Sequence, residues 1–320
     1  MGFERDWDNA FTGKQLKGKV THAPSYGGAL SFLRRKYTRE LEGVDVAITG
    51  VPFDTATSNR PGSRFGPRAL RAVSASLSWG RPWPWDVDPL EALNIIDYGD
   101  CNFDYGEPAS ISAAITHYFR KILEAGAATL ALGGDHYVTY PILEAYARHY
   151  GPLSLVHFDA HSDTWPDEED SERVDHGTMF HHAARKGMVD DSRSVQIGLR
   201  TTNDDPMGFN ILDANWVHEN GPVAVADKVR DIVGERKAYL TFDIDCLDPA
   251  FAPGTGTPVV GGLTTHQARE IIRGLAGINF VGADLVEVAP AYDVGEITAF
   301  AGATLALDFL CLFASRKGDD

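Results

Sequence analysis

The stretch Leu153-Ser154-Leu155-Val156-His157-Phe158-Asp159-Ala160-His161-Ser162-Asp163 joins a short apolar run to acidic and imidazole side chains at every other position. Because the run is short and rich in β-forming residues, we expect a buried strand over 153–159. Side chains alternate along a strand, so Asp159, His161 and Asp163 would converge on one face as the chain leaves it. The pattern therefore predicts a cluster of potential ligands at the carboxyl end of a strand.

Two further stretches place potential ligands after expected strands. A β-rich run over 238–242 leads into Asp243-Ile244-Asp245, which repeats the alternation, and the expected strand over 127–132 leads into Gly133-Gly134-Asp135-His136, where the acid and the imidazole are adjacent. Carboxylates gathered on one face repel one another and resist burial unless a cation lies among them. A single D-x-H or D-x-D motif is usually a helix cap or a turn acid. Three such motifs at strand ends indicate a metal centre, because ligands of open α/β sheets bind outside the carboxyl ends of the strands.

The order of elements predicts the fold class. We expect strands over 44–51, 93–97, 127–132, 153–159, 193–198, 211–215, 238–243 and 279–285. We expect helices over 66–77, 109–125, 137–149, 176–187, 222–234, 265–274 and 297–315. Strands that alternate with helices predict a three-layer α/β/α sandwich around an eight-stranded parallel sheet. No change in composition divides residues 41–320, which we expect to form one catalytic domain preceded by an N-terminal extension over 1–40.

Composition narrows the class of ligand. The 320 residues carry a net charge of −16, which disfavours nucleic acid as a partner and suits a cationic substrate. The cysteines (Cys101, Cys246 and Cys311) are scattered and odd in number, so they predict a reducing compartment. The charged N-terminus is not a signal peptide, and we expect a cytoplasmic protein. The apolar segment 297–314 carries only Asp308 as a charge, and we expect a buried helix there, with no membrane role.

The ligand set indicates which metal it would hold. Two imidazoles and four carboxylates are hard and rich in oxygen, which suits manganese better than zinc or copper. The set can hold two ions, each with its own histidine and aspartate and with two shared bridges: His136 with Asp163, His161 with Asp245, and the bridges Asp159 and Asp243. A water between two divalent ions loses a proton readily and becomes a nucleophile. The excess of carboxylates favours a cationic group such as guanidinium over a phosphate.

Other side chains carry weaker signals. Glu287, beyond the expected strand 279–285, is either a guanidinium partner or an ordinary ion-paired acid. His176 is either structural or the proton shuttle that a hydrolase expelling an amine requires. His157 shares the face of Asp159 but lies deeper, so we expect it in the core or behind the ligands. The acidic loop at 167–170 is either a solvated loop or a rim that attracts a cation.

These motifs resemble those of the ureohydrolases, the arginase and agmatinase family. The similarity runs from about Val44 to the C-terminus and includes the strand-end motifs and the segment 243–258. The sequences of 175–180, 245–248 and 286–293 are most similar to those of bacterial agmatinases. The resemblance implies an arginase-like α/β sandwich with an eight-stranded parallel sheet, assembled as a homotrimer or homohexamer.

The resemblance also implies roles for individual residues. Two manganese ions, with nickel as a minority alternative, would be bound by His136, Asp159, His161, Asp163, Asp243 and Asp245. The catalytic groups would be the proton-shuttling His176, the guanidinium partner Glu287 and the ligand Asp163, and the substrate contacts would include Glu287, Thr257 and Asn59.

The expected reaction is hydrolysis of agmatine to putrescine and urea. The segment 57–67 is also similar to guanidinobutyrases and proclavaminate amidinohydrolases, and Arg60 or Arg64 facing the pocket would favour a guanidino acid instead. A mononuclear zinc deacetylase would not need the second set of carboxylates. An inactive subunit would have lost ligands, whereas all six are present.

Overall fold

In the computed structural model, which describes residues 10, 16–18, 24–166 and 173–317, nine strands form one parallel sheet. Its order is β1-β3-β2-β4-β9-β8-β5-β6-β7. The strands are β1 (Lys36–Tyr37), β2 (Val46–Val51), β3 (Ile95–Asp100), β4 (Ala128–Gly133), β5 (Ser154–Phe158), β6 (Val195–Ile197), β7 (Asn210–Leu212), β8 (Lys237–Asp243) and β9 (Asn279–Val286). All eight predicted strands are present, and the additional strand is the two-residue β1 at one edge.

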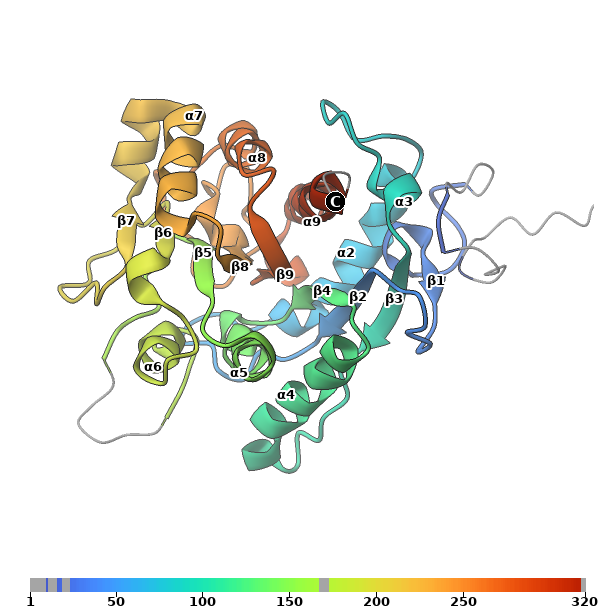
Figure 1. The fold of residues 1–320 in the computed structure, drawn as a ribbon, viewed down its shortest axis with the longest axis horizontal. Coiled ribbons are helices and arrows are strands. Elements are labelled where there is room, and N and C mark those ends of the chain that lie inside the picture. Colours follow the sequence, from blue (N-terminus) through green and yellow to red (C-terminus); the bar gives the residue numbers. More distant parts are fainter. Residues whose placement is uncertain (1–9, 11–15, 19–23, 167–172, 318–320) are drawn as a thin grey trace, which may run out of the picture.

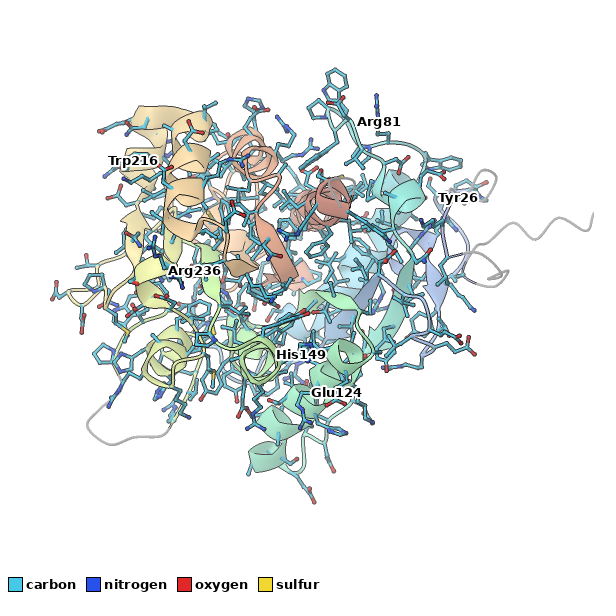
Figure 2. The ribbon with its side chains drawn as sticks, in the orientation of Figure 1. Tyr26, Arg81, Glu124, His149, Trp216 and Arg236 are labelled. Carbon is cyan, nitrogen blue, oxygen red and sulfur yellow. The ribbon has the colours of Figure 1, made fainter. Side chains whose placement is uncertain are left out.

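Helices cover both faces of the sheet, as predicted (Figure 1). One apolar cluster packs α2 (Gly66–Ser74), α7 (Ala214–Val233), α8 (Thr265–Gly274) and α9 (Ile297–Lys317) on one face. A second cluster packs α4 (Pro108–Glu124), α5 (Thr139–Tyr150) and α6 (Met179–Arg185) on the other. The outer sides of these helices face solvent, as Glu124 on α4 and His149 on α5 illustrate (Figure 2).

Three elements depart from the sequence-based expectation. Helix α7 begins eight residues before the predicted residue 222, because two helical segments are joined at Gly221, whose φ is +78°, and at Pro222. The short helix α3 (Pro89–Ala92), which was not predicted, is capped by Asp88 accepting a hydrogen bond from Leu90 N–H. Part of the predicted extension joins the fold, since Phe32 and Leu33 are fully buried in the core.

Helix α9 is the one described helix that is long and apolar enough to cross a membrane by length and composition. In the fold, 78% of its most apolar window is buried. It packs against α2, α8 and β9. Its apolar composition therefore reflects its position in the core, as predicted for this segment.

Strand order determines where the functional side chains meet. Strands β4, β9, β8 and β5 lie next to one another, although β9 is the last strand in the chain. Their registers align the carboxyl ends, with Phe158 beside Phe242 and Asp243 beside Val286. The residues that follow these four strands are therefore brought together at the carboxyl ends of the central strands.

Candidate metal centre

The six predicted ligands lie together at the carboxyl ends of β4, β5 and β8. They are His136 after β4, then Asp159, His161 and Asp163 after β5, then Asp243 at the end of β8 with Asp245 just beyond it. Five of the six are buried, and the side chain of His161 is 19% exposed. The chain does not remain extended through these positions, because Asp245 lies in the 3₁₀ turn Ile244–Cys246 and Asp163 has a φ of +51°, so turns at the strand ends aim the side chains at one place.

Their side chains form two adjoining groups. His136 Nδ1 lies 3.0 Å from Asp159 Oδ2, 3.0 Å from Asp163 Oδ2 and 3.4 Å from Asp243 Oδ2. His161 Nδ1 lies 3.3 Å from Asp159 Oδ1 and 3.2 Å from Asp245 Oδ2. Asp159 therefore presents one carboxylate oxygen to each group, which is the geometry of a bridging ligand. Asp243 faces the first group with Oδ2, whereas its Oδ1 accepts a hydrogen bond from Asp245 N–H at 2.8 Å.

The hydrogen bonding of His136 tests whether a cation fits. The Thr241 hydroxyl donates to Asp284 Oδ1 at 2.6 Å, so it accepts from His136 Nε2–H at 2.8 Å. The proton of a neutral imidazole is then on Nε2, and the lone pair of Nδ1 points at three carboxylate oxygens. Within the described residues, Nδ1 is buried and has no hydrogen-bond partner. A lone pair held among carboxylates is the arrangement that a metal ion satisfies, so these residues fit a metal.

The pKa values of the aspartates are shifted, as expected for carboxylates that are buried together without a cation. Burial raises the pKa of Asp243 well above its usual value, and the charges of Asp245 and Asp159 raise it further. Burial likewise raises the pKa of Asp245, with Asp159 adding to it. Burial opposes ionisation of Asp159 too, but the surrounding imidazoles of His136, His157 and His161, of which His157 donates to it at 2.8 Å, hold its pKa well below the usual value. A divalent cation would relieve the repulsion among these carboxylates.

His157 lies behind the ligands, as the sequence suggested. Its Nε2 is 2.8 Å from Asp159 Oδ2. The Gln196 amide donates to Ser162 O at 2.6 Å and lies 3.1 Å from His157 Nδ1. Gln196 therefore makes Nδ1 the acceptor and leaves Nε2–H to donate to Asp159. His157 thus orients a ligand oxygen.

Glu287 and His176 contact each other beside the predicted metal ligands. Glu287 Oε1 accepts from His136 N–H at 3.0 Å and lies 3.1 Å from His176 Nδ1. Its Oε2 is buried and has no hydrogen-bond partner within the described residues. Burial lowers the pKa of His176, but the hydrogen bond and charge of Glu287 outweigh it, and the pKa rises to about 9. One carboxylate oxygen remains available for a cationic group.

A cavity of about 310 Å³ opens over His176 and three of the predicted ligands, whereas Glu287 is not among the residues that line it. Its lining consists of Ser58, His161, Asp163, Trp165, Asp175, His176, Gly177, Thr178, Asp243 and Thr257. Thr257 thus lines the cavity, and its hydroxyl donates to Asp245 Oδ2 at 3.1 Å. Asn59 is not part of the lining and instead donates to Gly256 O at 3.1 Å. The predicted acidic loop at 167–170 lies outside the described residues.

Several side chains around the site were not identified from the sequence. Thr241 and Asp284 support His136, and Ser58, Trp165 and Asp175 line the cavity. Thr241 carried a usable signal, because it precedes Asp243 by two positions on the same strand face. Asp284 carried another, since an acid within an apolar strand requires partners. The residues of the cavity wall come from separate loops and share no local pattern.

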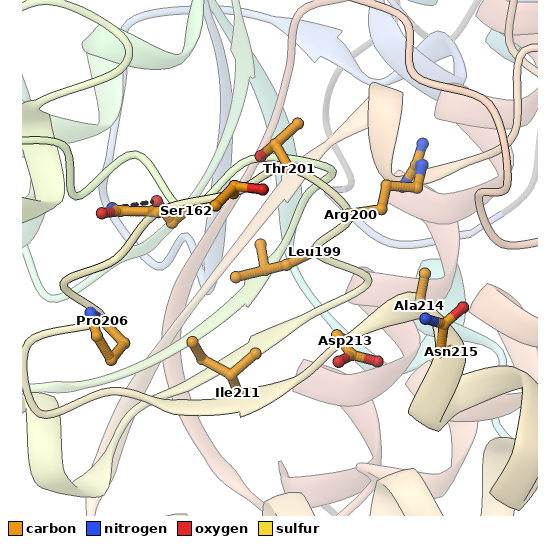
Figure 3. Close-up of a pocket in the computed structure, with 11 residues that line it drawn as sticks. Ser162, Leu199, Arg200, Thr201, Pro206, Ile211, Asp213, Ala214 and Asn215 are labelled. Carbon is orange, nitrogen blue, oxygen red and sulfur yellow. Dashed lines mark hydrogen bonds between the residues drawn. The ribbon is translucent and has the colours of Figure 1, made fainter.

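A second cavity of about 320 Å³ is lined in part by Ser162, Leu199 and Arg200 (Figure 3). Asn203 donates to Ser162 Oγ at 2.8 Å, so this residue links the cavity wall to the ligand loop. The guanidinium of Arg200 is occupied by backbone carbonyls, among them those of Asp245 and Val259. None of the six predicted metal ligands lines this cavity.

A parallel α/β sheet that carries two adjoining histidine–aspartate groups at its carboxyl edge defines the protein as a metal-dependent hydrolase with a binuclear site. The chain belongs to the arginase family, whose family model matches residues 44–311. This confirms the resemblance seen in the motifs.

Individual relatives support the assignment over nearly the whole chain. An agmatinase of Chromobacterium violaceum is 54% identical over 294 residues, covering 92% of this chain and 91% of that protein. The crystal structure of a hypothetical agmatinase from Burkholderia thailandensis is 56% identical, with a TM-score of 0.95 over 97% of this chain and 98% of that one. The proclavaminate amidino hydrolase from Streptomyces clavuligerus is 36% identical, with a TM-score of 0.87 over 92% of this chain and 100% of that one.

Proposed function

We propose that this protein hydrolyses agmatine to putrescine and urea with two manganese ions. The lining of the cavity carries the proposal: it includes the carboxylates of Asp163, Asp175 and Asp243 and, within the described residues, no lysine or arginine. Such a cavity favours a substrate that is positive at both ends. Agmatine has this charge pattern, whereas arginine and guanidinobutyrate each carry a carboxylate away from the guanidinium.

The ligand set supports the choice of metal. One ion would be held by His136 and Asp163 and the other by His161 and Asp245, with Asp159 and Asp243 shared between them. Oxygen-rich ligands with two imidazoles suit manganese, and nickel is the alternative. Two ions bound here would lower the pKa of a shared water and so supply the nucleophile at neutral pH.

The remaining steps belong to side chains of this protein. Glu287 Oε2 would accept an N–H of the guanidinium, because it is buried and lacks a partner within the described residues. Asp163 would help to position the reacting centre, because it is one of the predicted ligands of the ion held by His136. His176, held at Nδ1 by Glu287, would deliver a proton to the leaving amine. Thr257 would contact the substrate from the cavity wall.

The arginines that could reverse the substrate preference are occupied elsewhere. Arg60 donates to Thr255 O at 2.8 Å and to Gly256 O at 3.2 Å, and it stacks on Tyr292. Arg64 pairs with Asp54 and lies over the Tyr105 ring. Neither lines the cavity. A guanidino acid would therefore lack a cationic partner for its carboxylate.

Asp175 supports the preference for a second cation. Its Oδ1 accepts from Gly177 N–H at 3.0 Å, which holds the carboxylate at the cavity wall. Arg173 lies 3.6 Å from the other oxygen, but its side chain is 78% exposed, so solvent screens this pair. The distal ammonium of agmatine can then compete for Asp175.

The test is urea release by the manganese-loaded protein with agmatine, arginine and guanidinobutyrate. We expect kcat/KM for agmatine to exceed the other values by at least about tenfold, which corresponds to ~1.4 kcal/mol, within reach of one charge contact. A higher value for either guanidino acid would contradict the substrate assignment. Full turnover with a single zinc ion would contradict the binuclear manganese site.

We further propose that residues 41–320 form the catalytic domain, with 1–40 as an extension. We also propose that the protein acts in the cytoplasm and assembles as a homotrimer or homohexamer. The three cysteines support a reducing compartment, because all are free and buried. Light scattering of the purified protein tests the assembly, and a monomer at working concentration would exclude it.

A further inference from the structure

Both ring nitrogens of His176 are held, and by separate parts of the chain. On one side Nδ1 faces Glu287 Oε1 at 3.1 Å. On the other side Nε2 lies 2.9 Å from Ser58 N and 2.8 Å from Ser58 Oγ. Ser58 and His176 both line the cavity over the metal ligands. The nitrogen that faces the cavity wall is thus in contact with a hydroxyl group.

The backbone N–H and the hydroxyl of Ser58 favour different protonation states of the His176 ring. Its backbone N–H can only donate, so it stabilises the neutral ring with the proton on Nδ1. When the ring is protonated, Nε2–H and this N–H are two donors facing each other. The hydroxyl can donate to the neutral ring and can accept from the protonated one. Within the described residues, Ser58 Oγ is thus the acceptor in place for Nε2–H.

We propose that Ser58 relays the proton between His176 Nε2 and the leaving amine. The inference rests on the proposed function, in which His176 supplies that proton. In the step, the Nε2–H bond breaks as a new bond to Ser58 Oγ forms, while the original Oγ–H bond breaks and an N–H bond to the amine forms. The positive charge moves from the imidazolium to the departing ammonium, and Ser58 ends the step as a hydroxyl.

The surroundings of His176 support this direction of transfer. Glu287, Asp163 and Asp135 face the ring from three segments of the chain, and all three raise its pKa. The ring can therefore carry a proton at neutral pH and deliver it when a basic amine is released. Ser58 itself is exposed, and within the described residues its hydroxyl has no hydrogen bond other than that to His176. The hydroxyl is thus not part of the packing of the loop.

The experiment compares Ser58→Ala with Ser58→Thr in the manganese-loaded enzyme, measuring kcat and KM for agmatine across the pH range. Thr57→Ala is the matched control, because the Thr57 hydroxyl bonds to Asp54 O at 3.2 Å on the same loop. We expect Ser58→Ala to lower kcat at least about tenfold with little change in KM, within the range of acid–base groups. Ser58→Thr should restore most of the loss, and Thr57→Ala should cause little.

Two further readouts separate a relay from a structural role. The loss in Ser58→Ala should shrink for an alkylguanidine with a trifluoro-substituted leaving amine compared with its unsubstituted analogue, because a less basic amine needs less proton donation. Elemental analysis should find the same metal content in Ser58→Ala as in wild type. If Ser58→Ala fails to fold, the isosteric pair Ser58→Val and Ser58→Thr gives the same comparison.

The proposal is overturned if Ser58→Ala keeps kcat within about twofold of wild type. It is also overturned if the loss is equal for the two alkylguanidines, or if Thr57→Ala causes the same loss. These results differ from a failure of the proposed function, which would appear in the wild-type protein as absence of urea from agmatine. The alkylguanidine comparison remains valid with any guanidino substrate that wild type accepts.

Discussion

Replacing Thr241 with valine should weaken metal binding without disturbing the shape of the core. Thr241 lies on β8 and is fully buried. Its hydroxyl accepts from His136 Nε2–H at 2.8 Å and donates to Asp284 Oδ1 at 2.6 Å. Valine has nearly the same shape, so Thr241→Val removes these two hydrogen bonds and little else. The variant therefore isolates the support that this chain of bonds gives to a ligand.

The size of the effect follows from what is left unpaired. In the variant, His136 Nε2–H has no acceptor in a fully buried site, which costs about 1–3 kcal/mol. The ring can avoid this cost by moving its proton to Nδ1 or by rotating, and either change spoils Nδ1 as a ligand. Loss of such outer partners typically costs about 10–100-fold in metal affinity, or ~1.4–2.8 kcal/mol. The two ranges agree, so we expect a loss of about 10–100-fold for the ion bound by His136.

Calorimetric titration of the metal-free protein with manganese measures this loss directly. Thr139→Val is the matched control, because the Thr139 hydroxyl donates to Asp284 Oδ2 at 2.9 Å and does not touch His136. The reasoning fails if Thr241→Val binds manganese as tightly as wild type, or if Thr139→Val weakens binding equally.

Four further outcomes are expected. Asp159→Ala or Asp243→Ala should lose both ions and nearly all activity if these residues bridge, and elemental analysis that still finds two ions per chain would exclude bridging. His176→Asn should keep its metal but lower kcat by roughly 10²–10⁴-fold. In wild type, kcat should fall as the pH rises through about 9. Burial lowers the pKa of His176, but the Glu287 carboxylate outweighs it and raises the pKa to about 9, above which the ring has lost its proton. A pH profile that is unchanged in His176→Asn would refute this. Asp175→Asn keeps an acceptor for Gly177 N–H but removes the charge. The preference in kcat/KM for agmatine over an alkylguanidine with an uncharged tail should therefore fall by up to about tenfold, with KM more affected than kcat. An unchanged ratio of the two kcat/KM values would exclude Asp175 as the distal subsite.

The local part of the site was predictable because strand geometry is local. Asp159, His161 and Asp163 directly follow the buried strand β5, so their proximity was expected from the spacing, although Asp163 has a left-handed backbone (φ +51°) that simple alternation did not predict. The convergence with Asp243 also followed from a general rule, since parallel strands bring their carboxyl ends to one edge. That rule places these side chains at the same end of the sheet, whereas their close clustering also depends on β4, β9, β8 and β5 being neighbours.

Strand order itself is a long-range property, and the features that depend on it were not visible in the sequence. Strand β9 inserts between β4 and β8, which places Asp284 behind Thr241 and Glu287 beside His136. Ser58 meets His176 across 118 positions of chain. No periodicity links residues so far apart. The resemblance to a family supplied Glu287 and His176, whereas Ser58 and the partners of Asp284 emerged only from the three-dimensional arrangement.

The position of Glu287 shows how the fold fixes a charge beside the metal ligands. Its backbone has a φ of +63°, a left-handed conformation that costs roughly 1–2 kcal/mol for a residue with a side chain. Its N–H donates to Gly134 O at 2.8 Å, and Gly134 must itself lack a side chain, because a Cβ there would overlap the Phe53 carbonyl. The crowded ends of β2, β4 and β9 therefore hold Glu287 in a conformation that its own preference opposes. Because the fold maintains this strained conformation, the Glu287 carboxylate is already in position to accept a cation before a substrate binds.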